Sequence, residues 1–298
     1  MQSTLDRIGQ ERALPAERDR GRPPGARKPW LRDTALYLAL IALSALFALP
    51  FAWLISTSLK PPAEVFSDSF VGSDIHFKNY QDVFRNAPVG RWLLNSTIVA
   101  VLGVVSVLFS SSLAAYGFSR LRFPGRNKLF ALVIATYMLP SAATMIPTFL
   151  IWNEIGAVNT FFPLWAGNLF GSAFYIFMLR QFMFTIPQDF VDAARIDGAS
   201  YIRIYWNIIL PLVAPALAAV AVFEFQAKWN DFMTPLIYLN DPNKYTMSLG
   251  LASFKTDFEM QWALWMAASV IFTVPMVILF FIAQRYFIEA SLTSGIKG

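Results

Sequence analysis

The chain has 298 residues, of which 56% are apolar and only 14% charged, and its net charge is +5 at pH 7. Soluble domains carry about 25% charged residues, so this composition excludes an ordinary soluble domain and predicts a membrane protein. The absence of cysteine excludes disulfides, thiolate metal sites and cysteine nucleophiles, and a single histidine, His76, argues against a histidine-based metal site. The basic residues form no separate soluble domain, so we expect no nucleic acid partner.

The first 33 residues are charged, contain several prolines and glycines, and have almost no large apolar side chains. This composition predicts a disordered cytoplasmic tail over residues 1–33. The polar stretch is longer than the basic region of a signal peptide, and no convincing cleavage site follows the first apolar run. We therefore expect that first run to be a retained helix.

Six charge-free runs follow, and each reaches the roughly 20 residues that a helix needs to cross a bilayer. The runs are 34–59, 92–119, 129–153, 155–179, 204–223 and 260–284. Only Glu154 separates the third run from the fourth, and the polar and glycine residues after it predict a tight outer turn. The sequence thus predicts an all-α polytopic protein, with a six-helix domain over residues 34–288 and a short cytoplasmic tail over residues 289–298.

The distribution of Lys and Arg predicts the orientation of this domain. With the N-terminus inside, the inner segments hold 17 Lys and Arg and the outer segments hold 7. The inner loop over residues 119–128 contains four basic residues and no acid. Because basic residues are retained on the cytoplasmic side, we expect both termini to be cytoplasmic in a multi-pass plasma-membrane protein.

Ionisable side chains within the runs are few, and two of them are spaced four residues apart. Glu224 and Lys228 lie on one face of a helix, with the acid first, which is the better order for an ion pair. We interpret them as a structural pair near the outer end of the fifth span rather than as a proton relay. A proton- or sodium-coupled carrier would hold more buried acids than this chain does.

The segment 189–215, "DFVDAARIDGASYIRIYWNIILPLVAP", is a polar interruption between the fourth and fifth spans. Thr185 is a candidate cap for a short helix here, and Asp189 and Asp192 favour its positive N-terminal end. Arg195 falls near the C-terminal end of the same helix. The pattern predicts a short cytoplasmic helix between the two spans.

A second helix follows the first. Gly198 is placed for the left-handed residue that ends the first helix, and Ser200 can cap the second one, "YIRIYWNIIL". Ala193 and Ala194 keep one side of this two-helix elbow thin enough to enter a groove on another protein. The residues leave a second interpretation equally open, namely an amphipathic loop at the lipid headgroups anchored by aromatic side chains such as Tyr201.

The elbow resembles a known signature. "DAARIDG", followed by nine residues and "IILP", is similar to the EAA motif of ABC importer permeases, E-A-A-x-x-x-G followed by nine residues and I-x-L-P. The matching positions are Asp192, Ala193, Ala194, Gly198, Ile208, Leu210 and Pro211. The sequence departs from the motif at Asp192, which keeps the negative charge of glutamate but has a shorter side chain.

The resemblance covers nearly the whole chain after residue 33. The stretches "STSLKPPAEVF", "NSTIVAVLGVVSVLFSSSLAAYGFSRLRFPGRN", "WNEIGAVNTFFPL", "WNDFMTPLIYLNDPNKYTMSLGLASF" and "LTSGIKG" look like the smaller, six-span permease of maltose-type sugar importers. Such importers combine two homologous permeases, two ATPase subunits and an extracellular solute-binding protein. The resemblance implies an ATP-driven permease of sugars or sugar derivatives that works by alternating access.

The resemblance also implies roles for particular residues. The elbow would be the coupling helix, which contacts the ATPase through Asp192, Ala193, Ala194, Arg195, Asp197, Gly198, Ala199 and Ser200. The C-terminal "SLTSGIKG" would reach the ATPase, and the last outer loop, 231–262, would meet the binding protein. No Walker motif is present, so we expect the chain to bind no cofactor, with ATP and Mg on the partner ATPase.

Two other functions remain as alternatives. An ion-coupled secondary carrier would transport its solute without ATP, and an intramembrane enzyme would need a nucleophile–base pair or a metal cluster that the sequence does not offer. We predict no catalytic and no metal-binding residues. Aromatic faces and amide groups within the spans are candidates for a sugar site, and they are Tyr137, Asn168, Tyr175, Phe223 and Trp229. The sequence does not distinguish among a sugar, an oligosaccharide, a polyol and glycerol phosphate.

Overall fold

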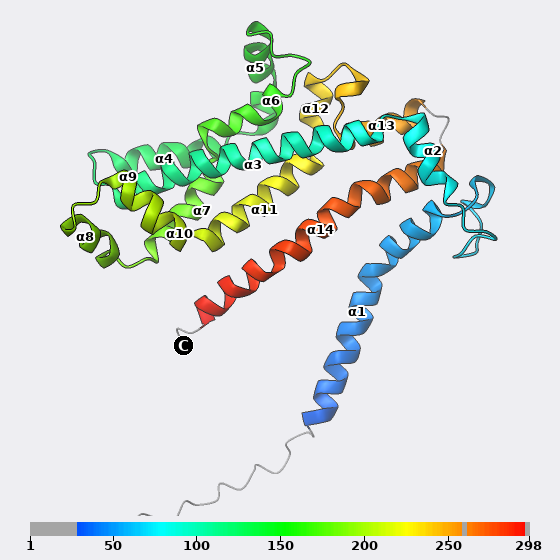
Figure 1. Ribbon diagram of the computed structural model, residues 1–298, viewed down its shortest axis with the longest axis horizontal. Helices are drawn as coiled ribbons and strands as arrows, with labels where there is room; N and C mark the ends of the chain where they lie inside the picture. The colour runs from blue at the N-terminus through cyan, green and yellow to red at the C-terminus, as the bar shows by residue number, and fades with distance from the viewer. Residues whose placement is uncertain (1–28, 258–260, 296–298) are drawn as a thin grey trace, which may run out of the picture. The chain divides into compact units, whose positions relative to one another are not determined.

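The computed structural model describes residues 29–257 and 261–295, and this part of the chain is helical and contains no strand (Figure 1). Short 3-10 segments and one π segment are labelled η. In chain order the elements are α1 Pro29–Ser58, η1 Pro62–Glu64, α2 Lys78–Asn86, α3 Val89–Arg120, α4 Arg126–Tyr137, α5 Ser141–Glu154, α6 Phe162–Trp165, η2 Ala166–Phe170, α7 Ala173–Phe184, α8 Asp189–Ile196, α9 Tyr201–Ile204, η3 Tyr205–Ile209, α10 Leu210–Leu212, α11 Ala214–Asn230, α12 Met233–Tyr238, η4 Pro242–Lys244, α13 Met247–Asp257 and α14 Trp262–Gly295.

The chain forms two units, Met1–Ala52 and Trp53–Gly298. The described part of the first unit is the N-terminal stretch of α1, where the side chains of residues 33–52 are all exposed. Apolar side chains surround this helix on every side, as expected for a helix in lipid. It begins at Pro29, within the tail predicted over residues 1–33, and residues 1–28 of that tail lie outside the described residues.

In the second unit, α3 is the central helix. It packs along α7 and α11, and α11 packs in turn on α14. The first apolar core joins α3, α7 and α11 to the segment that follows α7, and a second core joins the start of α3 to α2, α13 and α14. The helix α3 therefore contributes side chains to both apolar cores and connects them.

The predicted number of six spans agrees with the described helices once two bent pairs are counted as one span each. Four segments are long and apolar enough to cross a membrane on their own, beginning at Asp33, Val89, Phe162 and Trp262. The third predicted span is α4 and α5, which meet at 96°, and the fifth is α9–α10 followed by α11, which meet at 76°. Prolines at these breaks remove backbone donors, which explains why the helices cannot continue straight.

The fourth span differs from its prediction in two ways. The apolar run begins at residue 155, but residues 155–161 form a loop and the helix starts only at Phe162. The span is then interrupted between α6 and α7, where η2 and Gly171 break the regular helix. Irregular backbone at membrane depth requires partners from the protein itself. Ser110 Oγ donates to the Asn168 carbonyl at 2.6 Å, and Ser111 Oγ accepts from the Ser172 amide at 3.0 Å.

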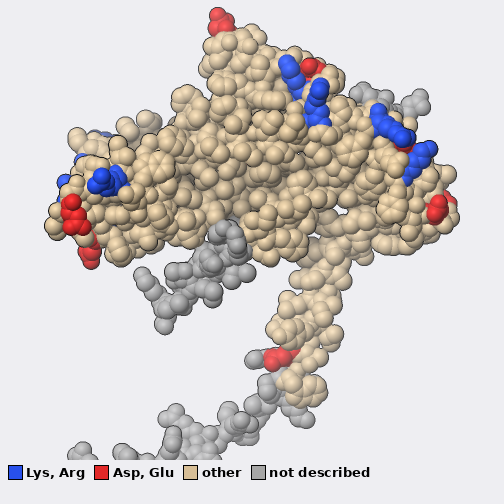
Figure 2. All heavy atoms as spheres, in the orientation of Figure 1, with Lys and Arg blue, Asp and Glu red and all other residues tan. Residues whose placement is uncertain are grey.

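The charged residues of the second unit gather toward the two ends of α3 on the face shown in Figure 2. One group lies over the region of α8 and α9, and the other extends over the regions of α5, α12, α13 and α2, with a band almost free of charge between them. An uncharged band between two charged rims is the pattern expected of a unit that spans a bilayer.

Candidate functional site

The polar elbow consists of α8 and α9. Asp189 and Asp192 lie in the first turn of α8 and Arg195 lies in its last turn, so the charges complement the helix dipole. Gly198 follows with a φ of 77°, a left-handed conformation that glycine adopts without strain. The Ser200 hydroxyl accepts a hydrogen bond from the Arg203 amide at 3.3 Å and so caps α9.

Thr185 does not cap α8, and that prediction is wrong. Its hydroxyl donates to the Phe182 carbonyl at 2.8 Å, at the end of α7. Gln188 occupies the cap position of α8 without a side-chain hydrogen bond to the helix. Thr185 is the C-cap residue of α7, so its hydroxyl lies beside the last carbonyls of that helix rather than beside the first amides of α8.

One face of the elbow is buried and the other is open. Val191 and Ala194 pack into the first apolar core, whereas Phe190, Ile196 and Ile202 are 52%, 87% and 71% exposed. The elbow residues exposed to solvent are Asp192, Ala193, Arg195, Asp197, Gly198 and Ser200, and Ala199 is half-buried. Large apolar side chains on an open face mark a surface that another molecule can cover.

The buried side of the elbow is held by a stripe of polar residues on α3. Ser112, Tyr116 and Arg120 are four residues apart and therefore share one face of that helix. The Ser112 and Tyr205 hydroxyls lie 2.7 Å apart within hydrogen-bonding distance, and the Tyr116 hydroxyl donates to the Tyr201 carbonyl at 3.0 Å. These contacts fix α9 and η3, the π segment that follows it, against α3.

Arg120 holds the beginning of the elbow. Its guanidinium donates to the carbonyls of Met183 and Ile186, the latter at 2.7 Å, and to the Gln188 side-chain oxygen at 2.8 Å. The Gln188 amide donates in turn to the Asp192 carboxylate at 3.3 Å. A cation beside the C-terminal carbonyls of a helix is stabilising, so Arg120 stabilises the exit from α7, and through Gln188 it orients the first turn of α8.

A second polar cluster lies beside the interrupted span. The Asn168 amide donates to the Glu224 carboxylate at 2.6 Å and to the Gly103 carbonyl at 3.0 Å. Glu224 and Lys228 are 3.8 Å apart, as their spacing predicts, and the Tyr175 side chain interacts with the same carboxylate. Both residues lie in the last two turns of α11, which agrees with their predicted position near the end of the fifth span, and Asn168 links Glu224 to Gly103 near the middle of α3.

This cluster supports the break in the fourth span. The Lys228 ammonium donates to the Leu164 carbonyl at 2.8 Å, at the end of the short α6. Glu224 is 6% exposed, and a buried carboxylate needs such paired donors to remain in the interior. The sequence predicted the Glu224–Lys228 pair because two ionisable residues occur at the end of an apolar run. It did not predict the contacts of this pair with α3 and η2.

The five candidates for a solute site fall into different surroundings. Asn168 and Tyr175 meet at Glu224, whereas Tyr137 is exposed and stacks on Phe174 with ring centroids 6.0 Å apart. The remaining two candidates, Phe223 and Trp229, are respectively 42% and 1% exposed.

Trp229 is enclosed by its neighbours. It stacks on Phe225 and Phe272 at 5.5 Å and 5.6 Å, and its ring nitrogen donates to the Phe272 carbonyl. Its surroundings are those of a core residue. Among the described residues, no three His, Cys, Asp or Glu side chains come close enough to hold a metal ion.

A family model described as "Binding-protein-dependent transport system inner membrane component" matches residues 106–290. The chain belongs to this family. It is therefore a multi-pass inner-membrane permease of an ABC importer rather than an ion-coupled secondary carrier. The matched region contains both the elbow and the Glu224 cluster.

Individual relatives of this ABC permease align over almost the full chain. It is 34% identical to the arabinooligosaccharides transport system permease protein AraQ of Halalkalibacterium halodurans, over 87% of this chain and 94% of that one. It is 30% identical to the osmoprotective compounds uptake permease protein GgtD of Synechocystis sp., over 88% of this chain and 91% of that one.

The fold is similar to that of a solved transporter chain. A crystal structure of a bacterial ABC transporter involved in the import of the acidic polysaccharide alginate aligns with a TM-score of 0.79. The alignment covers 89% of this permease and 100% of that chain, with 24% sequence identity. The helical arrangement is therefore that of an ABC importer transmembrane chain.

Proposed function

We propose that this permease carries a sugar or sugar derivative across the plasma membrane by alternating access, driven by ATP hydrolysis on separate subunits. The family is defined by dependence on a binding protein, and the relative AraQ transports arabinooligosaccharides. A solute-binding protein would deliver the sugar to the outer side, and a second, homologous permease would complete the path. Both termini and the elbow would lie on the cytoplasmic side, in line with the 17 Lys and Arg assigned there.

The observation that supports a coupling role is the two-sided construction of the elbow. Ser112, Tyr116 and Arg120 fasten it to α3 from behind, while apolar side chains such as Ile196 remain open in front. A surface that is open in front and rigidly held behind can receive force from a partner and pass it to the spans. The partner would be an ATPase, with one of two copies seated on the elbow of each permease.

The same helix connects the elbow to the middle of the membrane. α3 continues from Arg120 through Ser110 to Gly103, where it meets the interrupted span and the Glu224 cluster. Movement of the elbow would therefore reach the break between α6 and α7 through one continuous helix. Broken helices near the middle of the bilayer are common where transporters bind and release solutes.

Among the five candidates for the sugar site, we propose Tyr137 and Phe223 as the residues that meet the solute directly, because both are exposed. Asn168 and Tyr175 would shape the site from behind through Glu224. Trp229 would contribute only by packing. An alternative in which this chain forms only a wall and the second permease holds the sugar predicts that Tyr137→Ala leaves uptake unchanged.

The coupling role can be tested at Gly198. A Cβ there meets nothing within 4 Å, but the positive φ makes any larger residue strained, so Gly198→Val should distort the turn without clashing. We expect the variant to insert normally into the membrane. The amount of ATPase that co-purifies with it should fall at least fivefold, and sugar should no longer stimulate ATP hydrolysis in proteoliposomes.

Gly156→Val is the matched control. Gly156 has a φ of 69° and equally open surroundings, but it lies in the loop after α5, away from the elbow. The control should keep the ATPase and its stimulation. Equal ATPase association and equal uptake in the two variants would contradict the coupling role of the elbow.

A further inference from the structure

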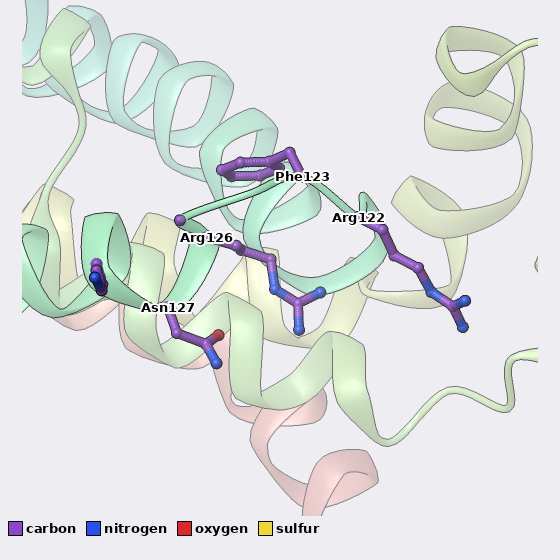
Figure 3. A pocket seen from close by; sticks show the side chains of 6 residues that line it. Arg122, Phe123, Arg126 and Asn127 are labelled. Atoms are coloured by element: carbon purple, nitrogen blue, oxygen red, sulfur yellow. The ribbon is translucent and has the colours of Figure 1, made fainter.

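The loop between α3 and α4 forms an open pocket beside the elbow. The pocket has a volume of about 490 Å³ and is lined by Arg122, Phe123, Gly125, Arg126, Asn127 and Lys128. Figure 3 shows the guanidinium groups of Arg122 and Arg126 and the amide of Asn127 extending to one side of the loop, with the Phe123 ring on the other. None of these side chains takes part in the contacts that fasten the elbow to α3.

The pocket carries three positive charges and no compensating acid. No Asp or Glu occurs between residues 119 and 153. Within the described part of the chain, the side chains of Arg122 and Lys128 have no hydrogen-bond or ion-pair partner, and the Arg126 guanidinium donates only to the Leu121 carbonyl at 3.2 Å. Arg126 also lies near enough to the Arg180 guanidinium on α7 for the two cations to repel each other. A bound anion would relieve this repulsion and supply the missing acceptors.

Apolar side chains border the basic pocket. Phe123 in the loop and Leu129 and Leu132 on α4 are 40%, 53% and 64% exposed. Leu129 is three residues after Arg126 and Leu132 is four residues after Lys128, so Leu129 lies on the side of α4 that carries Arg126 and Leu132 lies on the side that carries Lys128. A ligand that matches this surface has an anionic head and hydrocarbon chains, which a free inorganic anion does not have.

We propose that this pocket binds the phosphate headgroup of an anionic phospholipid, with the acyl chains lying along the exposed side of α4. The inference rests on the proposed function only for its place in the cytoplasmic leaflet. Arg122, Arg126 and Lys128 contact the phosphate, and Phe123 and Leu129 contact the upper part of the chains. Because the loop follows Arg120 directly, the lipid anchors the α3–α4 loop in the cytoplasmic leaflet beside the helix that carries the elbow.

The test uses the purified importer with all of its subunits in detergent. A fluorescent phosphatidylglycerol is bound and then displaced by unlabelled phosphatidylglycerol, phosphatidylcholine or inorganic phosphate at equal ionic strength, with anisotropy as the readout. We expect phosphatidylglycerol to compete at least fivefold better than either of the others. Inorganic phosphate that competes equally well would overturn the lipid assignment.

Substitutions assign the binding to this pocket. Arg122→Gln with Arg126→Gln and Lys128→Gln should weaken phosphatidylglycerol binding at least fivefold. Arg122→Gln with Lys128→Gln, which spares the hydrogen bond from Arg126 to Leu121, should weaken it at least threefold. Unchanged lipid binding in both variants would contradict the proposal.

The charge-matched control removes three basic residues at the opposite end of α3. Lys78→Gln with Arg85→Gln and Arg91→Gln changes net charge equally and should leave lipid binding unaltered. Loss of lipid binding in this control would show that binding depends on net charge rather than on this pocket, and would contradict the proposal.

Two further measurements separate this inference from other outcomes. If the triple variant keeps its lipid affinity but loses the ATPase subunits, the loop binds an acidic protein surface and the lipid proposal fails. The binding measurement needs no transported solute, so a failure to transport sugar would contradict the proposed function without affecting the lipid result.

Discussion

The two ends of α3 are both anchored by polar side chains, but the bonded segments differ in how far they are buried. At the end near Val89, which is the outer end in the proposed orientation, Trp92, Asn95 and Ser96 bond to the backbone of residues 242–247 at 2.7–3.0 Å, beside the second apolar core. At the inner end, the elbow is bonded to α3 with similar geometry, yet its far side exposes large apolar groups such as Ile196.

The two ends therefore differ in how much of each contact is buried. At the outer end Phe84 and Leu94 are exposed, but the bonded tryptophan Trp92 is 2% exposed within the second apolar core, so this contact contributes to the stability of the subunit. The inner end is held in position but not covered, which is the construction expected of a surface that docks another protein. Disruption of the first should lower stability, whereas disruption of the second should affect coupling more than folding.

The largest effect is expected at the outer end. Trp92 is 2% exposed, and its ring is so close to α13 that a Cβ on Gly250 would lie 2.2 Å from it. Trp92→Ala should remove this packing and the hydrogen bond to Pro242, lowering the free energy of unfolding by about 3 kcal/mol. Thermal unfolding of the purified subunit in detergent measures the change.

The control for this substitution is Trp30→Ala, at an exposed tryptophan of α1. It should shift the unfolding temperature very little. If both variants unfold at the wild-type temperature, the outer end is not the stabilising contact described above.

A smaller effect on stability, with a larger one on coupling, is expected at the inner end. Arg120→Met leaves the carbonyl of Ile186 without its donor and releases Gln188, at a cost of about 2 kcal/mol. Hydrogen exchange should increase over residues 186–199 and stay constant over residues 242–250, and ATP hydrolysis should become independent of the solute.

Arg120→Lys sharpens this test, because lysine keeps the charge but lacks the fork that reaches several acceptors at once. It should give intermediate exchange and partial coupling. Exchange that increases equally at both ends of α3 in Arg120→Met would show that the two anchors are not independent.

The smallest effect is expected from pH in the loop between α1 and α2. The Glu64 carboxylate accepts hydrogen bonds from the Ser73 hydroxyl and from its amide, the latter at 2.8 Å, and these bonds lower the pKa of Glu64 from its ordinary value. The contribution to loop stability is therefore complete above the ordinary glutamate pKa, near 4.3, and is lost as the pH falls through the lower folded value.

Limited proteolysis of this loop between pH 6 and pH 3 measures the loss. Glu64→Gln should remove the part of the pH dependence that belongs to this carboxylate. A loop that is cleaved at the same rate across this range in the wild type would contradict the prediction.

The parts of the fold that depend on local chemistry were predictable. Hydropathy indicated the six apolar runs, and the turn preferences of glycine and serine indicated where α8 ends and α9 begins, at Gly198 and Ser200. The absence of charge does not reveal where the backbone leaves the helix, so the loop at residues 155–161 and the interruption after α6 were missed. Thr185 was misassigned because two helix ends compete for the same hydroxyl.

The parts that depend on contacts between distant segments were not predictable from one sequence. Tyr116 and Tyr201 are 85 residues apart in the chain, and Asn168 and Glu224 are 56 apart. Nothing in the local sequence specifies these pairs. The spacing of Ser112, Tyr116 and Arg120 could have indicated one polar side on α3, but the segment that it contacts is identified only by the fold.

The π segment Tyr205–Ile209 has a consequence for rotation about the fifth span. Each residue turns an α-helix by about 100°, so the extra residue held in a π turn changes the angular relation between the residues before it and those after it. The π turn therefore sets the rotation of α9 relative to the helix α11, which carries Glu224. Deleting one residue within 205–209 would restore regular winding and turn the carboxylate away from Asn168, or the elbow away from α3, so this single turn keeps both alignments compatible.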